Sequence, residues 1–387
     1  MAGLEQLCAS REIIITCGSG GVGKTTTAAS LGAYAAARLG GKVLVLTVDP
    51  AKRLATALGL EQFGNVETRV PEDLLVEAGL EPAGELWVAM LDTKQSWDDL
   101  VRSNAPDPVT RDSILANPLY RNITGRFVQS HDYIAMERLY EIHASGRYDL
   151  IIVDTPPSRN AIDFLDAPDR MADFVSSSLL RWLITPSRSR LVTAASRPFT
   201  TIADRILGAQ FLSDITEFFV LFQTMYEGFA ERAESVSRTL SDRRTSFVVV
   251  TTLEEAPVRD AEFFLAALTE RNLHCGAVIL NKALPDACTD PVATAIAGRL
   301  STESAALADE LVAAVGGSIP GLADSAQTER VLRELGRSFG DYRVVAIRER
   351  EQAESLAKLA DVLVTSPHLD RDIGDLAGLV ALGRSLW

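Results

Sequence analysis

A glycine-rich stretch near the start of the chain carries the clearest chemistry in the sequence. Residues 18–25 read G-S-G-G-V-G-K-T and satisfy the pattern G-x-x-x-x-G-K-[ST]. Glycines let the backbone curl until its N–H groups converge on a phosphate at the start of a helix. The pattern therefore predicts a loop that binds ATP and Mg²⁺. Its residues are Gly18, Ser19, Gly20, Gly21, Val22, Gly23, Lys24, Thr25 and Thr26.

Two side chains of this loop have specific expected roles. Lys24 reaches the β- and γ-phosphates and acts in catalysis, and the hydroxyl of Thr25 binds Mg²⁺. Two aspartates end apolar runs elsewhere in the chain. Asp154 follows residues 150–153 and is expected to hold Mg²⁺ through its water, whereas Asp49 follows residues 43–48.

We expect Asp49 to orient or deprotonate the attacking water beside the metal. Carboxylates at the C-terminal ends of adjacent parallel strands face the crevice in which ligands bind. The alternative for both aspartates is a cap on the following turn. Asn281, which ends the run V-I-L-N, has two interpretations as well. Its amide can pair with an adenine edge, or it can simply form a turn.

The elements that must position these side chains follow from apolar runs separated by helical patterns. Strands are predicted at residues 12–17, 43–48, 86–91, 150–153, 247–251, 277–280 and 343–347, and a helix at residues 24–38. Strands that alternate with helices and are apolar on both faces form parallel sheets covered on both sides. The predicted fold is a single α/β domain over residues 1–387, with a doubly wound, mostly parallel sheet of the P-loop NTPase type.

The alternation stops between residues 164 and 243, where the pattern is helical. Eight of the fourteen phenylalanines lie in this segment, and apolar residues from Phe211 to Phe229 follow one face of a long helix. We interpret residues 164–243 as a helical subdomain inserted in the α/β domain. Its aromatic face is either core or dimer contact, or a client-binding surface whose exposure changes between the ADP and ATP states.

Composition limits the partners. The 38 basic and 52 acidic side chains give a net charge of −14, which argues against a nucleic-acid backbone or an anionic membrane as the docking partner. The four cysteines form no C-x-x-C pair, no secretory signal is recognised, and no apolar run approaches the length of a membrane span. A cytoplasmic location is expected. Residues 372–387 are apolar at helical spacing but carry few basic residues, so we expect them to pack on the body rather than on a membrane.

The runs G-S-G-G-V-G-K-T-T, T-V-D-P-A, D-T-P-P-S and L-N-K resemble the ArsA/Get family of arsenite-pump and tail-anchored-protein-targeting ATPases. The resemblance covers nearly the whole chain and implies a dimer that sandwiches the nucleotide. It places Asp49 in the first switch and Asp154 at the start of the second, and it assigns adenine recognition to Asn281. It also implies that the helical subdomain opens and closes an apolar surface with nucleotide state.

The sequence departs from the family pattern at several positions. Ser19 stands where members carry a lysine that reaches the partner's ATP, and Lys52 and Arg53 replace His-Asn. The second-switch aspartate is followed by T-P-P-S-R-N instead of T-A-P-T-G-H, and the zinc-binding C-x-x-C of eukaryotic members is missing. Three accounts of Ser19 are open. Lys52 or Arg53 supplies the charge, a lysine-bearing paralogue completes a heterodimer, or hydrolysis is slow; we favour the heterodimer.

Three functions agree with these observations. The leading hypothesis is an ATP-driven chaperone or targeting factor, acting as a homodimer or heterodimer, for hydrophobic protein segments. The second is an energising or regulatory ATPase subunit of a membrane (anion) transporter, or a low-activity partner of a paralogous ATPase. The third is a positioning ATPase. A transporter partner predicts stimulation by that partner or its anion, whereas a chaperone predicts capture of apolar segments.

Overall fold

The computed structural model describes residues 3–48, 52–60, 64–121, 128–156, 165–167, 169–170, 173, 226–315, 319, 324–369 and 372–387. At its centre lies an eight-stranded sheet in the order β3-β4-β2-β5-β1-β6-β7-β8. The strands are β1 (Ile13–Cys17), β2 (Gly41–Thr47), β3 (Thr68–Arg69), β4 (Gly84–Met90), β5 (Leu150–Asp154), β6 (Thr245–Thr251), β7 (Cys275–Ala283) and β8 (Leu363–Pro367). All pairings are parallel except that of the short edge strand β3 with β4. The predicted doubly wound α/β sheet is confirmed.

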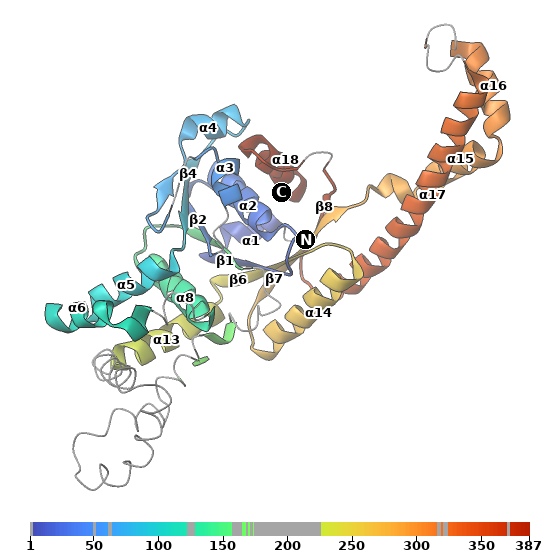
Figure 1. The fold of residues 1–387 in the computed structure, drawn as a ribbon. Helices are drawn as coiled ribbons and strands as arrows, with labels where there is room; N and C mark the ends of the chain where they lie inside the picture. The colour runs from blue at the N-terminus through green and yellow to red at the C-terminus, as the bar shows by residue number, and fades with distance from the viewer. Residues whose placement is uncertain are drawn as a thin grey trace.

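Helices cover both faces of the sheet and divide the core in two (Figure 1). One core contains α1 (Leu4–Ala9), α2 (Lys24–Leu39), α3 (Lys52–Ala57), α4 (Glu72–Glu77) and α18 (Leu376–Leu386). The other contains α5 (Thr93–Asn104), α6 (Pro108–Ala116), α8 (Val128–Ala144), α13 (Tyr226–Ser241) and α14 (Glu255–Glu270). Strand β1 begins with three isoleucines because both of its faces are covered: Ile13 and Ile15 lie in the second core and Ile14 in the first.

The strand predicted at residues 343–347 is wrong. These residues lie inside α17 (Ser325–Leu356), where Val344 and Val345 are about half exposed. A short apolar run does not distinguish a strand from a turn of helix, and here the flanking Arg and Glu residues continue the helix. The last strand is β8 instead. Of its five side chains only that of Ser366 is fully buried, and the strand lacks the continuous apolar pattern of the central strands.

An arm of helices projects from the sheet beyond β7 (Figure 1). It consists of η1 (Asp286–Thr289), α15 (Pro291–Thr302), α16 (Ser304–Val315) and the 32-residue α17. Helices α15 and α17 pack so closely that a Cβ on Gly336 would lie 2.6 Å from the carbonyl oxygen of Ala297. The base of the arm begins three residues after β7 ends. Because β7 is parallel to β6 and β6 to β1, this end of β7 lies on the same side of the sheet as the glycine-rich loop that follows β1.

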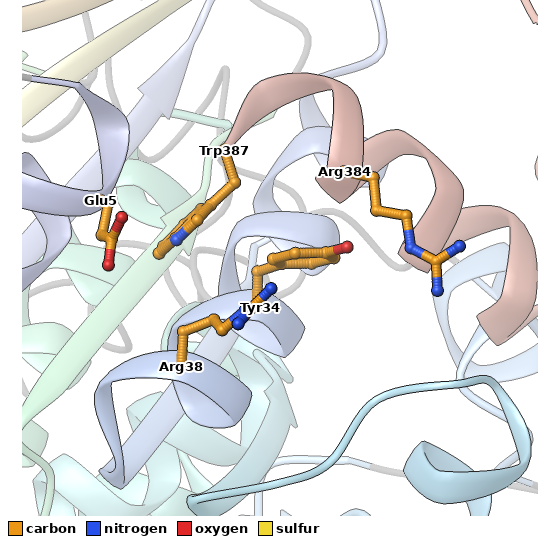
Figure 2. A pocket seen from close by; sticks show the side chains of 5 residues that line it. All are labelled: Glu5, Tyr34, Arg38, Arg384 and Trp387. Carbon is orange, nitrogen blue, oxygen red and sulfur yellow. The ribbon is translucent and has the colours of Figure 1, made fainter.

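The two remaining expectations concern segments at the periphery. The C-terminal residues form α18, which packs on α2: Ser30 Oγ donates to the Leu379 carbonyl at 2.7 Å, and the Tyr34 and Trp387 ring centroids are 5.7 Å apart (Figure 2). The expected packing on the body is confirmed. Of the helical subdomain, residues 174–225 lie outside the described residues, whereas residues 226–241 are helical. None of the helices in the described part of the chain is long and apolar enough to cross a membrane.

Candidate nucleotide site

The glycine-rich loop connects β1 to α2, and three of its glycines have backbone conformations that favour glycine. The φ angles of Gly18, Gly21 and Gly23 are 146°, 80° and 98°. Packing adds a second requirement, because a Cβ on Gly18 would lie 2.0 Å from the Val250 carbonyl oxygen and one on Gly23 would lie 2.3 Å from Asn281 Nδ2. A Cβ on Gly21, in contrast, would meet nothing within 4 Å. The loop is therefore held against β6 and β7 on one side and open on the other.

The start of α2 is arranged to receive an anion. Its N-cap, Gly23, makes no side-chain cap hydrogen bond, and no acidic residue lies in the first turn. The first N–H groups of a helix need partners and carry partial positive charge. Lys24 is 6% exposed, and its Nζ donates to the Ser19 carbonyl at 2.9 Å. These features fit the phosphates of a nucleotide, which would accept hydrogen bonds from the loop and from the helix start.

Asp154 ends β5 beside this loop. Strand β5 lies between β1 and β2, and Asp154 is opposite both Thr16 and Thr47 in the register. The carboxylate is fully buried, and its Oδ2 accepts a hydrogen bond of 3.0 Å from Thr47 Oγ1. Thr155 Oγ1 donates to the Thr16 carbonyl at 2.8 Å, which holds the strand end in place. A buried carboxylate next to the loop is suited to hold the water shell of Mg²⁺.

The few oxygen donors that the protein offers at this site fit magnesium better than a metal ion whose ligands all come from the protein. Mg²⁺ keeps several waters and is bound through one or two carboxylates together with substrate phosphates. Here Thr25 and Asp154 are the described candidates for its ligands. Elsewhere in the described residues, no group of three or more His, Cys, Asp or Glu side chains could hold a metal ion. The protein would therefore contribute only part of the metal's coordination.

Asp49 lies outside the described residues, and so do the side chains of Lys52 and Arg53. The strand before Asp49 ends next to the site, since the N–H of Val48 donates to the Asp154 carbonyl at 3.0 Å. The predicted roles of Asp49, Lys52 and Arg53 remain predictions. At Ser19, the buried hydroxyl oxygen has no hydrogen-bond partner among the described residues, whereas the carbonyl of the same residue accepts from Lys24.

Asn281 lies beneath the loop, and both ends of its amide contact protein backbone. Nδ2 donates to the Val22 carbonyl at 2.8 Å, and Oδ1 accepts from the N–H of Lys282 at 3.0 Å. The residue is 7% exposed and fills the space that a side chain at position 23 would need. In this structure Asn281 lies within β7 and supports the loop. Adenine recognition by this residue remains a prediction.

Sequence reasoning did not assign a role to two residues that contact the site. Thr47 was part of an apolar strand pattern, and its bond to Asp154 depends on the pairing of β2 with β5. Lys282 belongs to the run L-N-K, and its Nζ donates to the Gly21 carbonyl at 3.3 Å. A polar residue near the end of an otherwise apolar strand was the available signal for Thr47.

Three of the four cysteines are unsuited to binding a soft metal or metalloid in this structure. All four are free thiols, and Cys8 and Cys17 are buried. Burial raises the pKa of Cys8 and that of Cys275 to about 12, and it also raises the pKa of Cys17. Because the thiolate is the metal-binding form, these three groups stay protonated at neutral pH.

Comparison with known proteins agrees with the geometry. Putative arsenical pump-driving ATPase 1 of Aquifex aeolicus is 24% identical over 289 residues, which are 71% of this chain and 64% of that protein. The ATPase ASNA1 homolog of Entamoeba dispar is 24% identical over 295 residues, covering 74% of this chain and 81% of the relative. The ATPase get3 of Aspergillus terreus is 25% identical over 272 residues, covering 69% and 72%. The match thus spans less than two thirds of the Aquifex protein.

A family model extends this similarity over most of the described sheet. The model described as anion-transporting ATPase matches residues 11–309, which include the glycine-rich loop, Asp154 and Asn281. It ends within α16, so α17, β8 and α18 lie beyond the match. The chain belongs to the anion-transporting ATPase family.

Proposed function

We propose that this chain binds Mg·ATP and hydrolyses it, and that nucleotide state changes the shape of a dimer. The observation that carries the proposal is the loop itself: its glycines allow the tight curl, Lys24 contacts the loop backbone, and the start of α2 has no side-chain cap. Asp154 lies at the end of the neighbouring strand. Family membership supports the same activity.

The described residues have distinct roles in this proposal. The N–H groups at the start of α2 bind and orient the phosphates, and Lys24 moves from the Ser19 carbonyl to a phosphate oxygen. Asp154, held by Thr47, fixes the water shell of the metal. Magnesium, when bound, neutralises developing charge on the phosphates. Asp49 is proposed to orient the attacking water or to accept a proton from it.

ATP hydrolysis is tested directly with purified full-length protein, Mg²⁺ and ATP, by phosphate release. The matched variant is Lys24→Met, which removes the ammonium and keeps a long side chain. We expect phosphate release to require Mg²⁺ and to fall by about 100-fold or more in Lys24→Met, because loss of positioned phosphate charge costs several kcal/mol. Failure of the native chain to bind ATP at millimolar concentration would remove the proposal.

The partner is proposed to be either a second copy of this chain or a paralogue with lysine at the position of Ser19. A serine carries no charge, so a lone chain would lack one stabilising contact across the dimer. Hydrolysis is compared for the lone chain, for the chain with its paralogues and for Ser19→Lys. Ordinary hydrolysis by the lone chain, with no gain from the lysine, would argue against the heterodimer.

We propose hydrophobic protein segments as the client, with the helical subdomain at residues 164–243 as the binding surface. The resemblance to targeting ATPases and the phenylalanine-rich pattern support this. The test is hydrogen exchange of residues 164–243 in the ADP and ATP-analogue states, together with capture of a peptide with an apolar 20-residue segment. The control is a peptide of equal length in which charged residues interrupt the apolar segment. Identical exchange in both states and no capture would rule out the client function.

A second candidate is an energising subunit of a membrane transporter. The description of the family and the name of the Aquifex relative favour it. Direct metalloid binding by Cys8, Cys17 and Cys275 is disfavoured by their raised pKa values, which favours a transporter role that acts through a partner protein. Stimulation of hydrolysis by membranes that contain that partner, but not by apolar peptides, would favour this candidate.

A further inference from the structure

Lys282 has an unusual backbone conformation at a sensitive position. Its φ angle is 60°, and among the described residues only Asn272, with a φ of 55°, is another non-glycine residue in the left-handed region. Asn tolerates this region better than Lys does. The register of β7 with β8 also shifts between Leu280 and Ala283, where Lys282 lies. Strained backbone that persists in a folded protein is concentrated at functional sites.

The backbone N–H and the side chain of Lys282 both take part in contacts that reach the glycine-rich loop. Its N–H is held by Asn281 Oδ1 at 3.0 Å, and Asn281 Nδ2 in turn holds the Val22 carbonyl at 2.8 Å. The Lys282 ammonium then donates to the Gly21 carbonyl at 3.3 Å, in an exposed contact. Gly21 is the glycine whose missing Cβ leaves open space. The ammonium therefore lies on the open rim of the loop.

The positive charge of Lys282 suits a site for phosphate groups. The chain carries a net charge of −14, which opposes the approach of a polyphosphate. Within the described part of the chain, two ammonium groups contact the loop backbone: Lys24 at the Ser19 carbonyl and Lys282 at the Gly21 carbonyl. A charged phosphate oxygen is a stronger acceptor for an ammonium than a neutral carbonyl. Both lysines can exchange their carbonyl for a phosphate.

We propose that Lys282 is a nucleotide-binding residue, whose ammonium leaves the Gly21 carbonyl and binds the phosphate chain of the nucleotide in the glycine-rich loop. The ligand class is a nucleoside di- or triphosphate. This inference rests on the proposed function, since it requires the loop to bind ATP. It adds a second cation, from the end of β7, to the one that the loop motif supplies through Lys24.

The test distinguishes the charge of Lys282 from the hydrogen bond by which it supports the Gly21 carbonyl. Lys282→Gln keeps a neutral donor for the Gly21 carbonyl and removes the charge, Lys282→Arg keeps the charge, and Lys282→Met removes both. Lys358→Gln is the control, because Lys358 is an exposed lysine beyond the end of α17. Affinities for ATP, ADP and adenosine are measured by calorimetry at two salt concentrations.

We expect Lys282→Gln and Lys282→Met to weaken ATP binding by about tenfold, since the exposed ammonium is partly screened. Adenosine binding should stay unchanged, and Lys282→Arg and Lys358→Gln should remain within about threefold of the native chain. The salt dependence of ATP binding should decrease in the Gln variant. Lys282→Gly, which removes the backbone strain, should weaken ATP binding equally while unfolding at a temperature no lower than the native chain.

Two results would overturn the inference. If Lys282→Gln binds ATP like the native chain while Lys282→Met does not, Lys282 only braces the loop. If all variants bind like the native chain, Lys282 does not contact the nucleotide. In both cases the native chain still binds ATP, so the proposed function stands. Absence of ATP binding by the native chain would instead refute the proposed function itself.

Discussion

The hydrogen bond between Thr47 and Asp154 allows a quantitative test of the site. Both residues are fully buried, and Thr47 Oγ1 lies 3.0 Å from Asp154 Oδ2. Thr47→Val replaces the hydroxyl with a methyl group and keeps the β-branched shape that the strand favours. A hydrogen bond to a charged group contributes about 1.5–3 kcal/mol, so the expected loss in free energy of unfolding is about 2 kcal/mol.

That free energy corresponds to a small but measurable temperature shift. An unfolding entropy of about 2.1 cal/mol/K per residue gives roughly 0.8 kcal/mol/K for this chain, so the midpoint should fall by about 2–3 °C. Function should change more, because the carboxylate proposed to hold the water of Mg²⁺ loses an orienting partner. Such outer contacts change metal affinity by about 10- to 100-fold.

The assay is a double-mutant cycle. Unfolding by urea and the Mg²⁺ dependence of ATP binding are measured for Thr47→Val, Asp154→Asn and the double variant. We expect Thr47→Val to cost at least about 1 kcal/mol less in the Asp154→Asn background, and Thr47→Ser to resemble the native chain. Equal effects of Thr47→Val in both backgrounds, with unchanged Mg²⁺ dependence, would refute a coupled pair.

Three further predictions concern the glycine-rich loop, a buried ion pair and the packing of α18. Gly23→Ala should abolish ATP binding, as measured by calorimetry, because its Cβ would lie 2.3 Å from Asn281 Nδ2 at a φ of 98°; Gly64→Ala, with nothing within 4 Å, is the control. Arg232→Met should cost about 3 kcal/mol in urea unfolding, since Arg232 Nε lies 2.7 Å from the buried Glu137 carboxylate. Burial already raises the pKa of Glu137, and a raised folded-state pKa means that stability falls as pH rises through it. The Arg232→Met loss should therefore be larger at pH 8 than at pH 5, and a pH-independent loss would contradict this. Leu379→Ala, at a residue 1% exposed, should cost about 2–4 kcal/mol in the same assay, whereas no change would mean that α18 does not pack on α2 as described.

Much of the fold could be predicted because its signals are local. The six correctly predicted strands are apolar on both faces, and a parallel sheet between two layers of helices buries both faces. The strand at residues 343–347 was wrong for the complementary reason. Its apolar run is short, and only the neighbouring residues of α17 determine whether such a run forms a strand or part of a helix. The antiparallel edge strand β3 is two residues long and leaves no pattern to read.

The site divides in the same way. The glycine-rich loop was predictable, since its motif lies in one short segment and the positive φ angles at Gly18 and Gly23 favour glycine. The hydrogen-bond partners of Asn281 could not be predicted from the sequence. Its amide can pair with a base or with backbone, and the packing of β7 beside the loop brings the Val22 carbonyl within 2.8 Å.

The sequence by itself determined the glycine-rich loop, the class of sheet, the position of Lys24 at the start of a helix and that of Asp154 at the end of a strand. Those features depend on residue types within one short segment. The tertiary structure alone decided the contacts that join segments far apart in the chain. Thr47 and Asp154 are separated by 107 positions and Lys282 and Gly21 by 261, and only the order and register of parallel strands bring them together. The projecting arm is likewise a result of packing, because small residues at Gly336 and Ala297 allow α15 and α17 to lie side by side.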